Sequence, residues 1–347
     1  MRAVSLRAPR EIVVEEVENP IAGPGQVVLD VERVGLCGTD AELFSGEIDD
    51  LPDWRFPQRL GHEWCGRVVS VGEGVDASWI GRRATADTML GCGVCARCLG
   101  GRQHVCDNRS EIGLIRWPGA LAEQLAVPAT ALLALPDSVD SEAGALVEPG
   151  GNAMRAVRGA GLASGDRLLV IGTGAIAMLS GLIARAAGAE VHLLGREPSS
   201  LEFAATMGFA GVWGPGSDGH AGHGELPRLP WDAVIDASNG DSVPARAVDL
   251  VEPGKRVVFI GLSTTPSLVD TRQIALKDVT VVGVLSASGG LAAAIEHYAS
   301  GLVDPRPLVG ATVGLDQVAD VLAGWRPSGS GRTGVGTGPK ILVDPRR

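Results

Sequence analysis

The strongest restriction on the fold of this chain is a short apolar run that passes through a glycine-rich turn into a second apolar stretch. Leu168–Ile171 has the pattern of a buried strand, GTGAIA follows, and Ala175–Ala187 has the pattern of a helix. The glycines permit a tight turn and let the backbone approach a pyrophosphate, toward which the helix N-terminus points. Because another strand pattern follows, the motif predicts a dinucleotide-binding turn made by Gly172, Gly174, Ala175, Ile176 and Ala177.

The region around this motif alternates between strand-like and helix-like segments. Five short apolar runs have the character of buried parallel strands: Leu168–Ile171, Glu190–Leu194, Ala233–Ile235, Arg256–Ile260 and Thr280–Val284. Helical stretches separate them, and this alternation is typical of a doubly wound α/β domain. We therefore expect a Rossmann domain with a parallel sheet over residues 151–289.

Residues 1–150 have a different texture. Short apolar runs such as Val27–Val31, Gly66–Val71 and Leu121–Val127 are separated by glycine and proline turns, which predicts a β-rich domain. The strand-like Lys340–Asp344 lies in a segment too short to fold alone, so we expect residues 290–347 to return to this first domain. A length of 347 residues suits two such domains.

Charge and hydropathy exclude several kinds of partner. The formal net charge is −11, whereas a nucleic-acid surface needs a basic face. No stretch is long, apolar and uncharged enough to span a bilayer, and the first residues, MRAVSLRAPREIVVEEV, contain no apolar signal core. We expect a cytoplasmic protein whose partner is a small molecule, with neither nucleic acid nor membrane involved.

Four cysteines are spaced as metal ligands. The segment GCGVCARCLGGRQHVC separates them by two, two and seven residues. Such gaps let the thiolates turn onto one centre, and four thiolates complete a closed tetrahedral zinc site with no position for a substrate. The long last gap and the absence of a following proline disfavour an iron–sulfur cluster. We predict a structural zinc lobe over about residues 91–107, with the ligands Cys92, Cys95, Cys98 and Cys106.

Three other segments offer ligands for a second, open metal site. GLCGTD contains Cys37, GHEWCG contains His62 and Glu63, and ALVEPGGNA contains Glu148 at the junction of the two domains. One thiolate, one imidazole and one or two carboxylates can hold zinc and leave a position open. Asp40 is a natural acceptor for the free imidazole nitrogen of His62.

The end of the second strand of the nucleotide domain bears on the choice of cofactor. An NAD enzyme places an acidic residue there to bind the ribose hydroxyls, but the sequence LLGREPSS has Gly195 followed by Arg196. Without a carboxylate there is no repulsion of the extra phosphate of NADP, and a guanidinium can bind that phosphate. Glu197 could instead turn inward and serve NAD. The pattern predicts that NADP is preferred and that NAD is possible.

The order of these motifs resembles the zinc-containing branch of the medium-chain dehydrogenase/reductase superfamily over essentially the whole chain. The resemblance implies a GroES-like catalytic domain, a Rossmann domain and a cleft between them. It also implies an NAD(P)-dependent alcohol dehydrogenase with one catalytic and one structural zinc per chain. Cys37, His62 and either Glu148 or Glu63 would hold the catalytic zinc, and Thr39 would contact the reacting hydroxyl.

Within this branch, the substrate features are mixed. Glu148, where simple alcohol dehydrogenases have cysteine, resembles polyol, glucose and threonine dehydrogenases, and Glu111 in EIGLIRWPG matches the sugar-contacting glutamate of glucose dehydrogenases. Asn152 in PGGNA is similar to threonine dehydrogenases. Two residues depart from the family: Glu42 replaces a common proton-relay histidine, and Ser286 replaces a sugar-binding asparagine.

These observations predict hydride transfer between NADP(H) and a secondary alcohol or ketone of a polyol, sugar, aminocyclitol or amino alcohol. An NAD-dependent threonine or simple-alcohol dehydrogenase is the alternative. A reductase of apolar carbonyls or activated alkenes would usually lack the full zinc set, and a non-enzymatic descendant would have lost Cys37 or His62. We expect the chain to form a homodimer or homotetramer.

Overall fold

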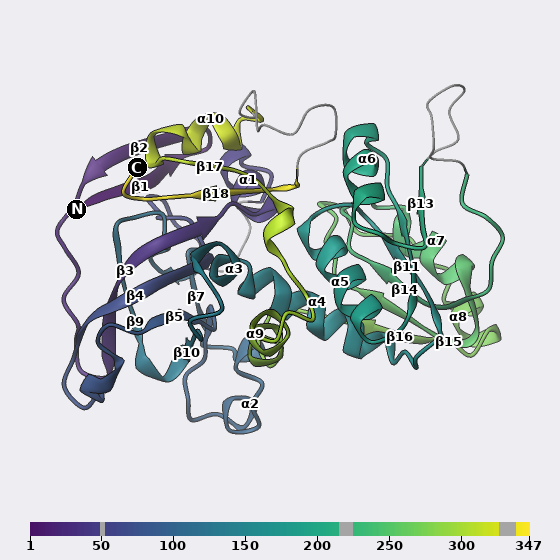
Figure 1. Ribbon diagram of the computed structural model, residues 1–347, viewed down its shortest axis with the longest axis horizontal. Helices are drawn as coiled ribbons and strands as arrows, with labels where there is room; N and C mark the ends of the chain where they lie inside the picture. Colours follow the sequence, from purple (N-terminus) through teal and green to yellow (C-terminus); the bar gives the residue numbers. More distant parts are fainter. Residues whose placement is uncertain (49–52, 215–224, 326–337) are drawn as a thin grey trace. The chain divides into compact units, whose positions relative to one another are not determined.

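The computed structural model describes residues 1–48, 53–214, 225–325 and 338–347, and every structural statement below refers to these residues. They form two compact units. The first contains Met1–Glu148, 286–325 and Lys340–Arg347, and the second contains Pro149–Leu285 together with residues 338–339. Figure 1 labels the elements of both units.

A largely antiparallel seven-stranded sheet dominates the first unit. Its order is β10 (Leu132–Ala134), β5 (Arg83–Ala86), β4 (Glu63–Val71), β3 (Gln26–Gly35), β18 (Lys340–Val343) and β17 (Val309–Val313), and β9 (Gln124–Pro128) also pairs with β3. The chain therefore returns to this sheet with β18, which pairs antiparallel with β3 and parallel with β17.

Two small sheets accompany it. The first is a hairpin of β1 (Arg2–Ala8) and β2 (Glu11–Glu16), and the second contains β6 (Met89–Leu90), β7 (Ser110–Ile112) and β8 (Arg116–Trp117).

The helices of the first unit are short. They are α1 (Gly38–Ser45), α2 (Ala96–Leu99), α3 (Ser141–Ala145), α9 (Leu291–Ala299) and α10 (Val318–Leu322), with 3-10 turns at Ala77–Trp79, Gln103–Val105, Ala129–Ala131, Arg306–Leu308 and Leu315–Gln317. Helix α4 (Val147–Ala160) begins in this unit and continues into the second.

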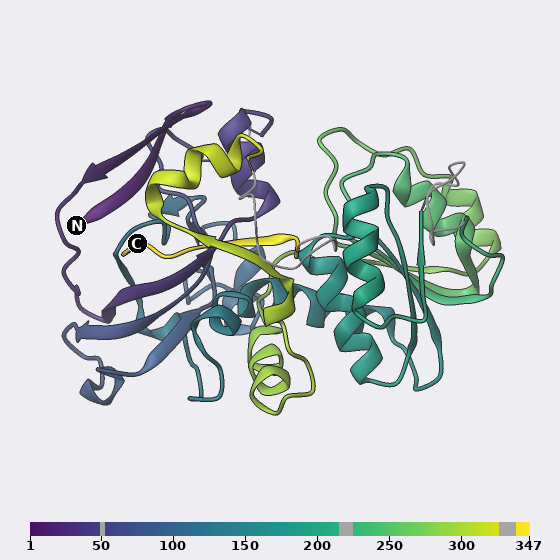
Figure 2. The same ribbon diagram turned by 45° about the horizontal axis from the view of Figure 1, so that its top comes forward.

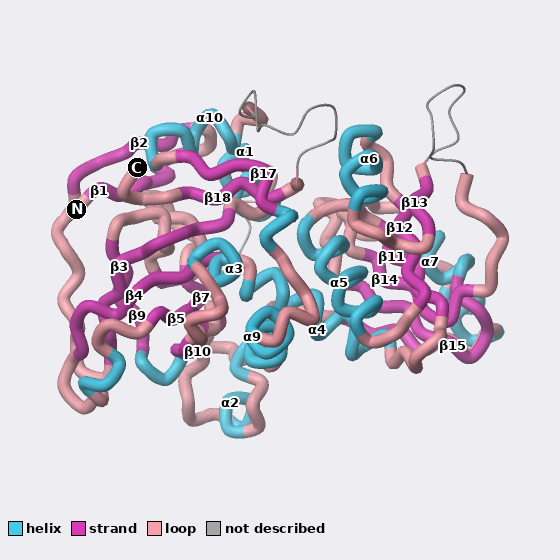
Figure 3. Tube along the Cα trace, in the orientation of Figure 1, coloured by secondary structure: helices cyan, strands magenta, loops and turns pink. Residues whose placement is uncertain are grey.

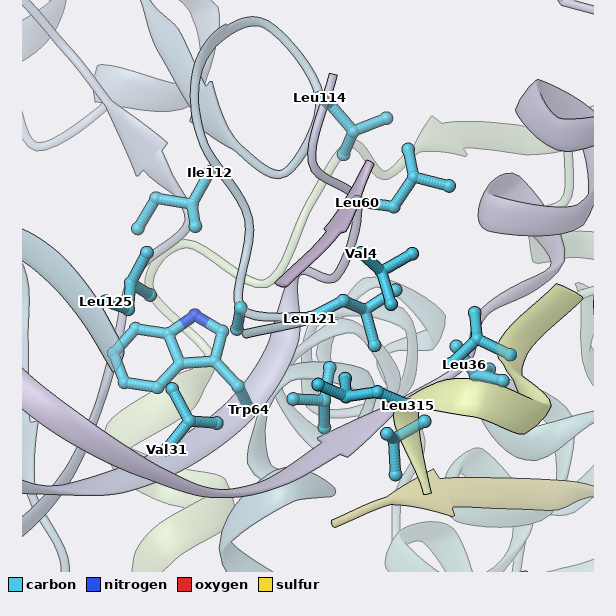
Figure 4. Packing of buried hydrophobic residues seen from close by; sticks show 14 of the residues in the cluster. Val4, Val31, Leu36, Leu60, Trp64, Ile112, Leu114, Leu121, Leu125 and Leu315 are labelled. Carbon is cyan, nitrogen blue, oxygen red and sulfur yellow. The ribbon is translucent and has the colours of Figure 1, made fainter. Parts of the chain in front are cut away.

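An aliphatic core fixes the strands that precede and follow the predicted metal ligands. The indole of Trp64 on β4 is fully buried and lies among Val31, Ile112 and Leu125, which come from β3, β7 and β9 (Figure 4). Replacing so large a buried aromatic residue by alanine typically costs about 3–5 kcal/mol. Since Trp64 follows Glu63 directly, this core holds the backbone of the predicted metal-binding segment in place.

The second unit is a six-stranded, wholly parallel sheet. Its order is β13 (Gly211–Trp213), β12 (Glu190–Leu194), β11 (Arg167–Ile171), β14 (Trp231–Asp236), β15 (Val251–Phe259) and β16 (Thr280–Gly283). Helices α5 (Ala175–Ala186) and α6 (Pro198–Thr206) cover one face, and α7 (Val243–Leu250) and α8 (Thr271–Leu276) lie on the other (Figures 1, 2 and 3). The first strand in sequence lies inside the sheet and the order reverses beside it, as in a doubly wound fold. The predicted fold class is confirmed.

Several strands differ from the sequence expectation: β3 continues to Gly35 beyond the expected Val31, β4 begins at Glu63 rather than Gly66, and three others differ for local reasons. Strand β15 begins at Val251 rather than Arg256, because Pro253 and Gly254, which resemble a turn, lie within an irregularly paired strand. Strand β9 begins at Gln124, because the preceding apolar residues form only an isolated bridge, Ala122 with Ala3. The three-residue β13 was not expected, since its short sequence carries no clear alternation.

Candidate active site

Three of the predicted catalytic zinc ligands lie together in the first unit. One ligand atom from each of Cys37, His62 and Glu63 lies within 4.8 Å of the other two. The antiparallel pairing of β3 with β4 places Gly35 opposite Glu63, so the residues that follow β3 meet those that begin β4. Gly35 is required at this point, since a Cβ atom there would lie 2.2 Å from Oε2 of Glu63.

Asp40 links the helix start to the imidazole. Its Oδ2 accepts a hydrogen bond of 2.9 Å from the backbone nitrogen of Cys37, the residue that caps α1. Its Oδ1 lies 3.7 Å from Nδ1 of His62, which is longer than a hydrogen bond, and neither atom has a hydrogen-bond partner in the described part of the chain. Asp40 is completely buried, so it faces the imidazole without access to water.

The electrostatics of this cluster fit a bound cation. Burial alone would lower the pKa of His62, but the charge of Asp40, the side chain of Cys37 and the charge of Glu148 outweigh it and raise that pKa well above its usual value. Burial also raises the pKa of Asp40. Thiolate, imidazole and carboxylate are the donors that zinc prefers, and an excess of anionic donors around one imidazole is what a divalent cation would neutralise.

A buried lysine, which no sequence pattern indicated, contacts one of the candidate ligands. Nζ of Lys340 lies 2.7 Å from Oε1 and 2.6 Å from Oε2 of Glu63, and it donates a third hydrogen bond of 3.0 Å to the carbonyl of Leu36. Lys340 and Glu63 are 3% and 1% exposed. Both carboxylate oxygens of Glu63 are therefore occupied by an ammonium group. The sequence feature that could have pointed to this residue is the rarity of lysine, which occurs at three positions in the chain. One of them, Lys340, begins the apolar strand KILV.

Two more acidic residues lie within electrostatic reach of His62. Glu148 is buried in the first turn of α4, and its charge acts on the imidazole. Glu111 lies half-buried on β7; burial raises the pKa of its carboxyl group, and the charge of His62 opposes that rise. The first unit thus brings Glu111 and Glu148 close to the same histidine.

The other predicted substrate and relay residues are placed as follows. Thr39 and Glu42 are half-buried on α1, and the pKa of Glu42 is raised by burial and by Glu47. Ser286 belongs to the first unit, has a φ of 67°, and its hydroxyl donates to the hydroxyl of Ser288 at 3.2 Å. Asn152 is buried on α4, within the second unit.

The four-cysteine lobe has the geometry of a zinc site. Its sulfur atoms lie within 4.8 Å of one another, with 3.9 Å between Cys92 and Cys98 and 3.8 Å between Cys95 and Cys106. Zinc–sulfur bonds of about 2.3 Å in a tetrahedron separate the sulfurs by about 3.8 Å. Backbone amides lower the pKa of Cys92 to about 6, which favours the thiolate that binds metal. The residues fit a closed zinc site.

The second unit holds the glycine-rich turn between β11 and α5. Gly172 has a φ of 123°, and a Cβ atom there would lie 2.8 Å from the carbonyl oxygen of Ala237. Gly174 is the N-terminal cap of α5 and has open space around it, so the first-turn amides of Ala175 and Ile176 are not covered by a capping side chain. Ala177 is fully buried and packs behind the turn. This arrangement fits the binding of a pyrophosphate group.

Gly195 lies at the same edge of the sheet as this turn. Because Ile171 and Leu194 are paired neighbours on β11 and β12, both loops leave the carboxyl ends of adjacent parallel strands. A Cβ atom on Gly195 would lie 2.5 Å from Cγ2 of Thr173, so the loop has no room for an acidic side chain unless Thr173 moves. Arg196 is exposed beside it, and the exposed Glu197 caps α6 through its backbone.

Two metal-ligand clusters in a β-rich unit, combined with a nucleotide-binding turn in a doubly wound unit, are typical of a zinc-dependent dehydrogenase. Comparison with known proteins agrees. Residues 23–137 match the alcohol dehydrogenase GroES-like domain, and residues 175–300 match the zinc-binding dehydrogenase domain. L-galactonate-5-dehydrogenase of Escherichia coli K12 is 30% identical over 83% of this chain and 84% of its own length.

Two further comparisons extend the likeness. An L-threonine 3-dehydrogenase of Idiomarina loihiensis is 29% identical over 82% of this chain and 84% of its own length. The structure of a zinc-binding dehydrogenase of Sinorhizobium meliloti 1021 bound to NADP has a TM-score of 0.86 and 28% identity, with 99% of both chains covered. The chain belongs to the zinc-containing medium-chain dehydrogenase/reductase superfamily.

Membership confirms the reaction class expected from the sequence. The protein is an NAD(P)-dependent, zinc-binding alcohol dehydrogenase that acts on a CH–OH group. Among the described helices, none combines the length and the apolar character needed to cross a membrane.

Proposed function

We propose that this dehydrogenase oxidises a secondary hydroxyl of a polyhydroxylated or amino-alcohol substrate, or reduces the corresponding ketone, with NADP(H) as the preferred cofactor. The observation that carries the proposal is the position of Glu111, a half-buried acceptor within electrostatic reach of His62 on a strand that leads into Gly113, which packs against Gly61. A partly desolvated carboxylate near the reacting centre binds a substrate that has further hydroxyl or ammonium donors more tightly. The carboxylate has already lost some of its hydrogen bonds with water, so it gives up fewer of them when the substrate binds.

We assign the catalytic zinc to Cys37, His62 and Glu148. Glu63 is the poorer candidate, since both of its oxygens already face the Lys340 ammonium group at 2.6 and 2.7 Å. Zinc, when bound, lowers the pKa of a coordinated hydroxyl and polarises a carbonyl. The four cysteines of the lobe hold the second, structural zinc, which gives two per chain.

The residues of α1 supply the route for the proton. Thr39 lies two residues after Cys37, and its hydroxyl both donates and accepts hydrogen bonds, so it can accept the proton of the substrate hydroxyl. Glu42 lies three residues further along the helix and therefore shares a face with Thr39. Burial raises the pKa of Glu42, which brings it closer to the range in which a carboxyl group can relay a proton.

The relatives support an oxygen-rich substrate. One is named for L-galactonate and another for L-threonine, both small polar alcohols. Glu111, which is not assigned to the zinc, favours neutral or cationic substrates over sugar acids in this chain. The test is a panel of sugars, cyclitols, amino alcohols, sugar acids and alkyl alcohols, with initial rates followed at the nicotinamide absorbance. A clear preference for alkyl alcohols would contradict the proposal.

Two features of the second unit support NADP. Gly195 supplies no carboxylate that would repel the phosphate, and Arg196 offers an exposed guanidinium to bind it. Glu197, exposed at the start of α6, supports the alternative, an NAD-dependent threonine or simple-alcohol dehydrogenase. A comparison of kcat/KM for NADP and NAD on one substrate distinguishes these two alternatives.

A homodimer through the second unit is the quaternary structure we propose. Strand β16 ends the sheet, so in the described chain one of its edges has no strand beside it, and Val281 is 40% exposed. Leu262, Leu268 and Leu276 are 77%, 91% and 81% exposed in the segments around α8 and before it. Light scattering of the purified protein and of a Val281→Lys variant tests this, since the charge should shift the mass toward the monomer.

A further inference from the structure

The four-cysteine lobe is inserted in a very short strand pair. Strand β6 ends at Leu90, the lobe follows, and the chain resumes at Ser110 on β7. The pairing between the two strands consists of Met89 with Glu111 and Leu90 with Ser110. The sheet has only three strands, β6, β7 and β8, of two or three residues each, so the β6–β7 pair needs an additional constraint at its closed end. The metal-binding lobe is the segment that closes it.

A buried carboxylate ties the lobe to the rest of the first unit. Oδ2 of Asp87 accepts a 2.8 Å hydrogen bond from Nε2 of Gln103, which lies in the lobe between Cys98 and Cys106. Its Oδ1 accepts from the backbone nitrogen of Met89 at 3.0 Å and from the hydroxyl of Ser288 at 2.9 Å. Asp87 is 8% exposed and Ser288 is 3% exposed. One anion thus joins the lobe, the start of β6 and the turn that carries Ser286.

The same contacts fix where Glu111 stands. Ile112, its neighbour, donates a backbone hydrogen bond of 3.0 Å to the carbonyl of Thr88, the residue after Asp87. Gly113 follows with a φ of 81°, and a Cβ atom there would lie 2.7 Å from the carbonyl oxygen of Gly61. Strand β7 is therefore held between Thr88 on one side and the residue preceding His62 on the other. A shift of β7 would move Glu111 relative to His62.

We propose that Asp87 is a positioning residue through which the four-cysteine lobe holds Glu111 near His62 and thereby sets the affinity for polyhydroxylated substrates. The link to such substrates rests on the proposed function, whereas the link from the lobe to β7 rests on contacts within the first unit alone. The structural metal site then serves specificity as well as folding, because it fixes the closed end of the hairpin that carries Glu111.

The experiment compares three variants of the intact protein. Gln103→Ala removes the lobe's hydrogen bond to Asp87, and Ser288→Ala removes a donor on the opposite side while leaving the lobe intact. Asp107→Asn is the matched control, since it breaks an ion pair with Arg97 inside the lobe that does not touch Asp87. Measurements are amide hydrogen exchange at residues 108–118, zinc content, and steady-state constants with the best polyol of the panel.

We expect Gln103→Ala to accelerate exchange at the Ile112 amide and to raise the polyol KM by about tenfold, the scale for losing a hydrogen bond to a charged group. The values of kcat and cofactor KM should stay within about twofold, and zinc content should be unchanged, because neither ligand set is touched. Ser288→Ala should also accelerate exchange at the Ile112 amide and raise the polyol KM. Asp107→Asn should change neither the exchange nor the polyol KM.

Unchanged exchange in both Gln103→Ala and Ser288→Ala would overturn the proposal, as would equal changes in the Asp107→Asn control. Faster exchange with an unaltered polyol KM would overturn the link from Glu111 to substrate. Should the enzyme prefer alkyl alcohols, the proposed function fails, but the exchange data still decide whether Asp87 positions β7.

Discussion

Replacing Lys340 by methionine should destabilise the metal-free protein more than the zinc-loaded one. All three donors of the ammonium group are used, two on Glu63 and one on the carbonyl of Leu36. Removing one partner of a buried pair leaves the other charge uncompensated, which costs about 3–5 kcal/mol. In the zinc-loaded protein, Glu63 can recover part of this loss, because one of its freed oxygens lies within 4.8 Å of the Cys37 and His62 ligand atoms.

The assay is urea unfolding of the metal-free and zinc-loaded forms, together with zinc affinity from competition with a chelator. We expect Lys340→Met to lose about 3–5 kcal/mol without zinc, to lose less with zinc, and to bind zinc more tightly by the difference. Cobalt substitution adds a second readout, since visible absorption reports an added carboxylate ligand. The double variant Glu63→Gln/Lys340→Met is the control and should recover much of the lost stability. Equal losses with and without zinc would refute this assignment of Glu63.

Four further outcomes are expected. Arg196→Ala should raise the KM for NADP by about 10- to 100-fold, the scale of a charge-assisted hydrogen bond, and change the KM for NAD little; equal effects in paired titrations would refute the NADP assignment. Cys98→Ser should lower the melting temperature and the zinc content first, because metal binding there contributes to folding; a stable, zinc-replete but inactive protein would contradict this. His62→Ala should abolish turnover while circular dichroism shows an intact fold, and full activity in a protein without the catalytic zinc would disprove the catalytic site. Glu111→Gln should raise the KM for polyols more than for alkyl alcohols, and a uniform change would argue against its role.

Local sequence patterns predicted the second unit well, because the residues that form its nucleotide-binding turn are contiguous in the sequence. The turn at Gly172 and Gly174, the strand before it and the helix after it are contiguous, so the strand–turn–helix order is visible in a single window of sequence. The same holds for the four cysteines, whose spacing alone determines that they can meet. The error at β15 arose because Pro253 and Gly254 carry a strong local signal for a turn that the pairing with β14 overrides.

The ion pair of Glu63 with Lys340 could not be predicted in this way. Its partners are 277 positions apart and meet only because β18 is inserted beside β3. Asp87 was missed for a similar reason: its contact with Ser288 spans 201 positions and crosses the whole second unit in sequence. Long-range polar contacts carry no periodicity, so their partners emerge only from the topology.

The insertion of β18 between β3 and β17 also affects the order in which the two units can be completed during synthesis. Most of the second unit comes from one stretch, Pro149–Leu285, which can begin to fold as soon as it leaves the ribosome. The first unit begins earlier along the chain but lacks an interior strand of its sheet until Lys340–Val343 has been translated. Until then, Glu63 lacks the ion pair with the ammonium group of Lys340. The nascent chain therefore carries an incomplete metal-binding unit and most of the nucleotide-binding unit until β18 completes the sheet of the first unit.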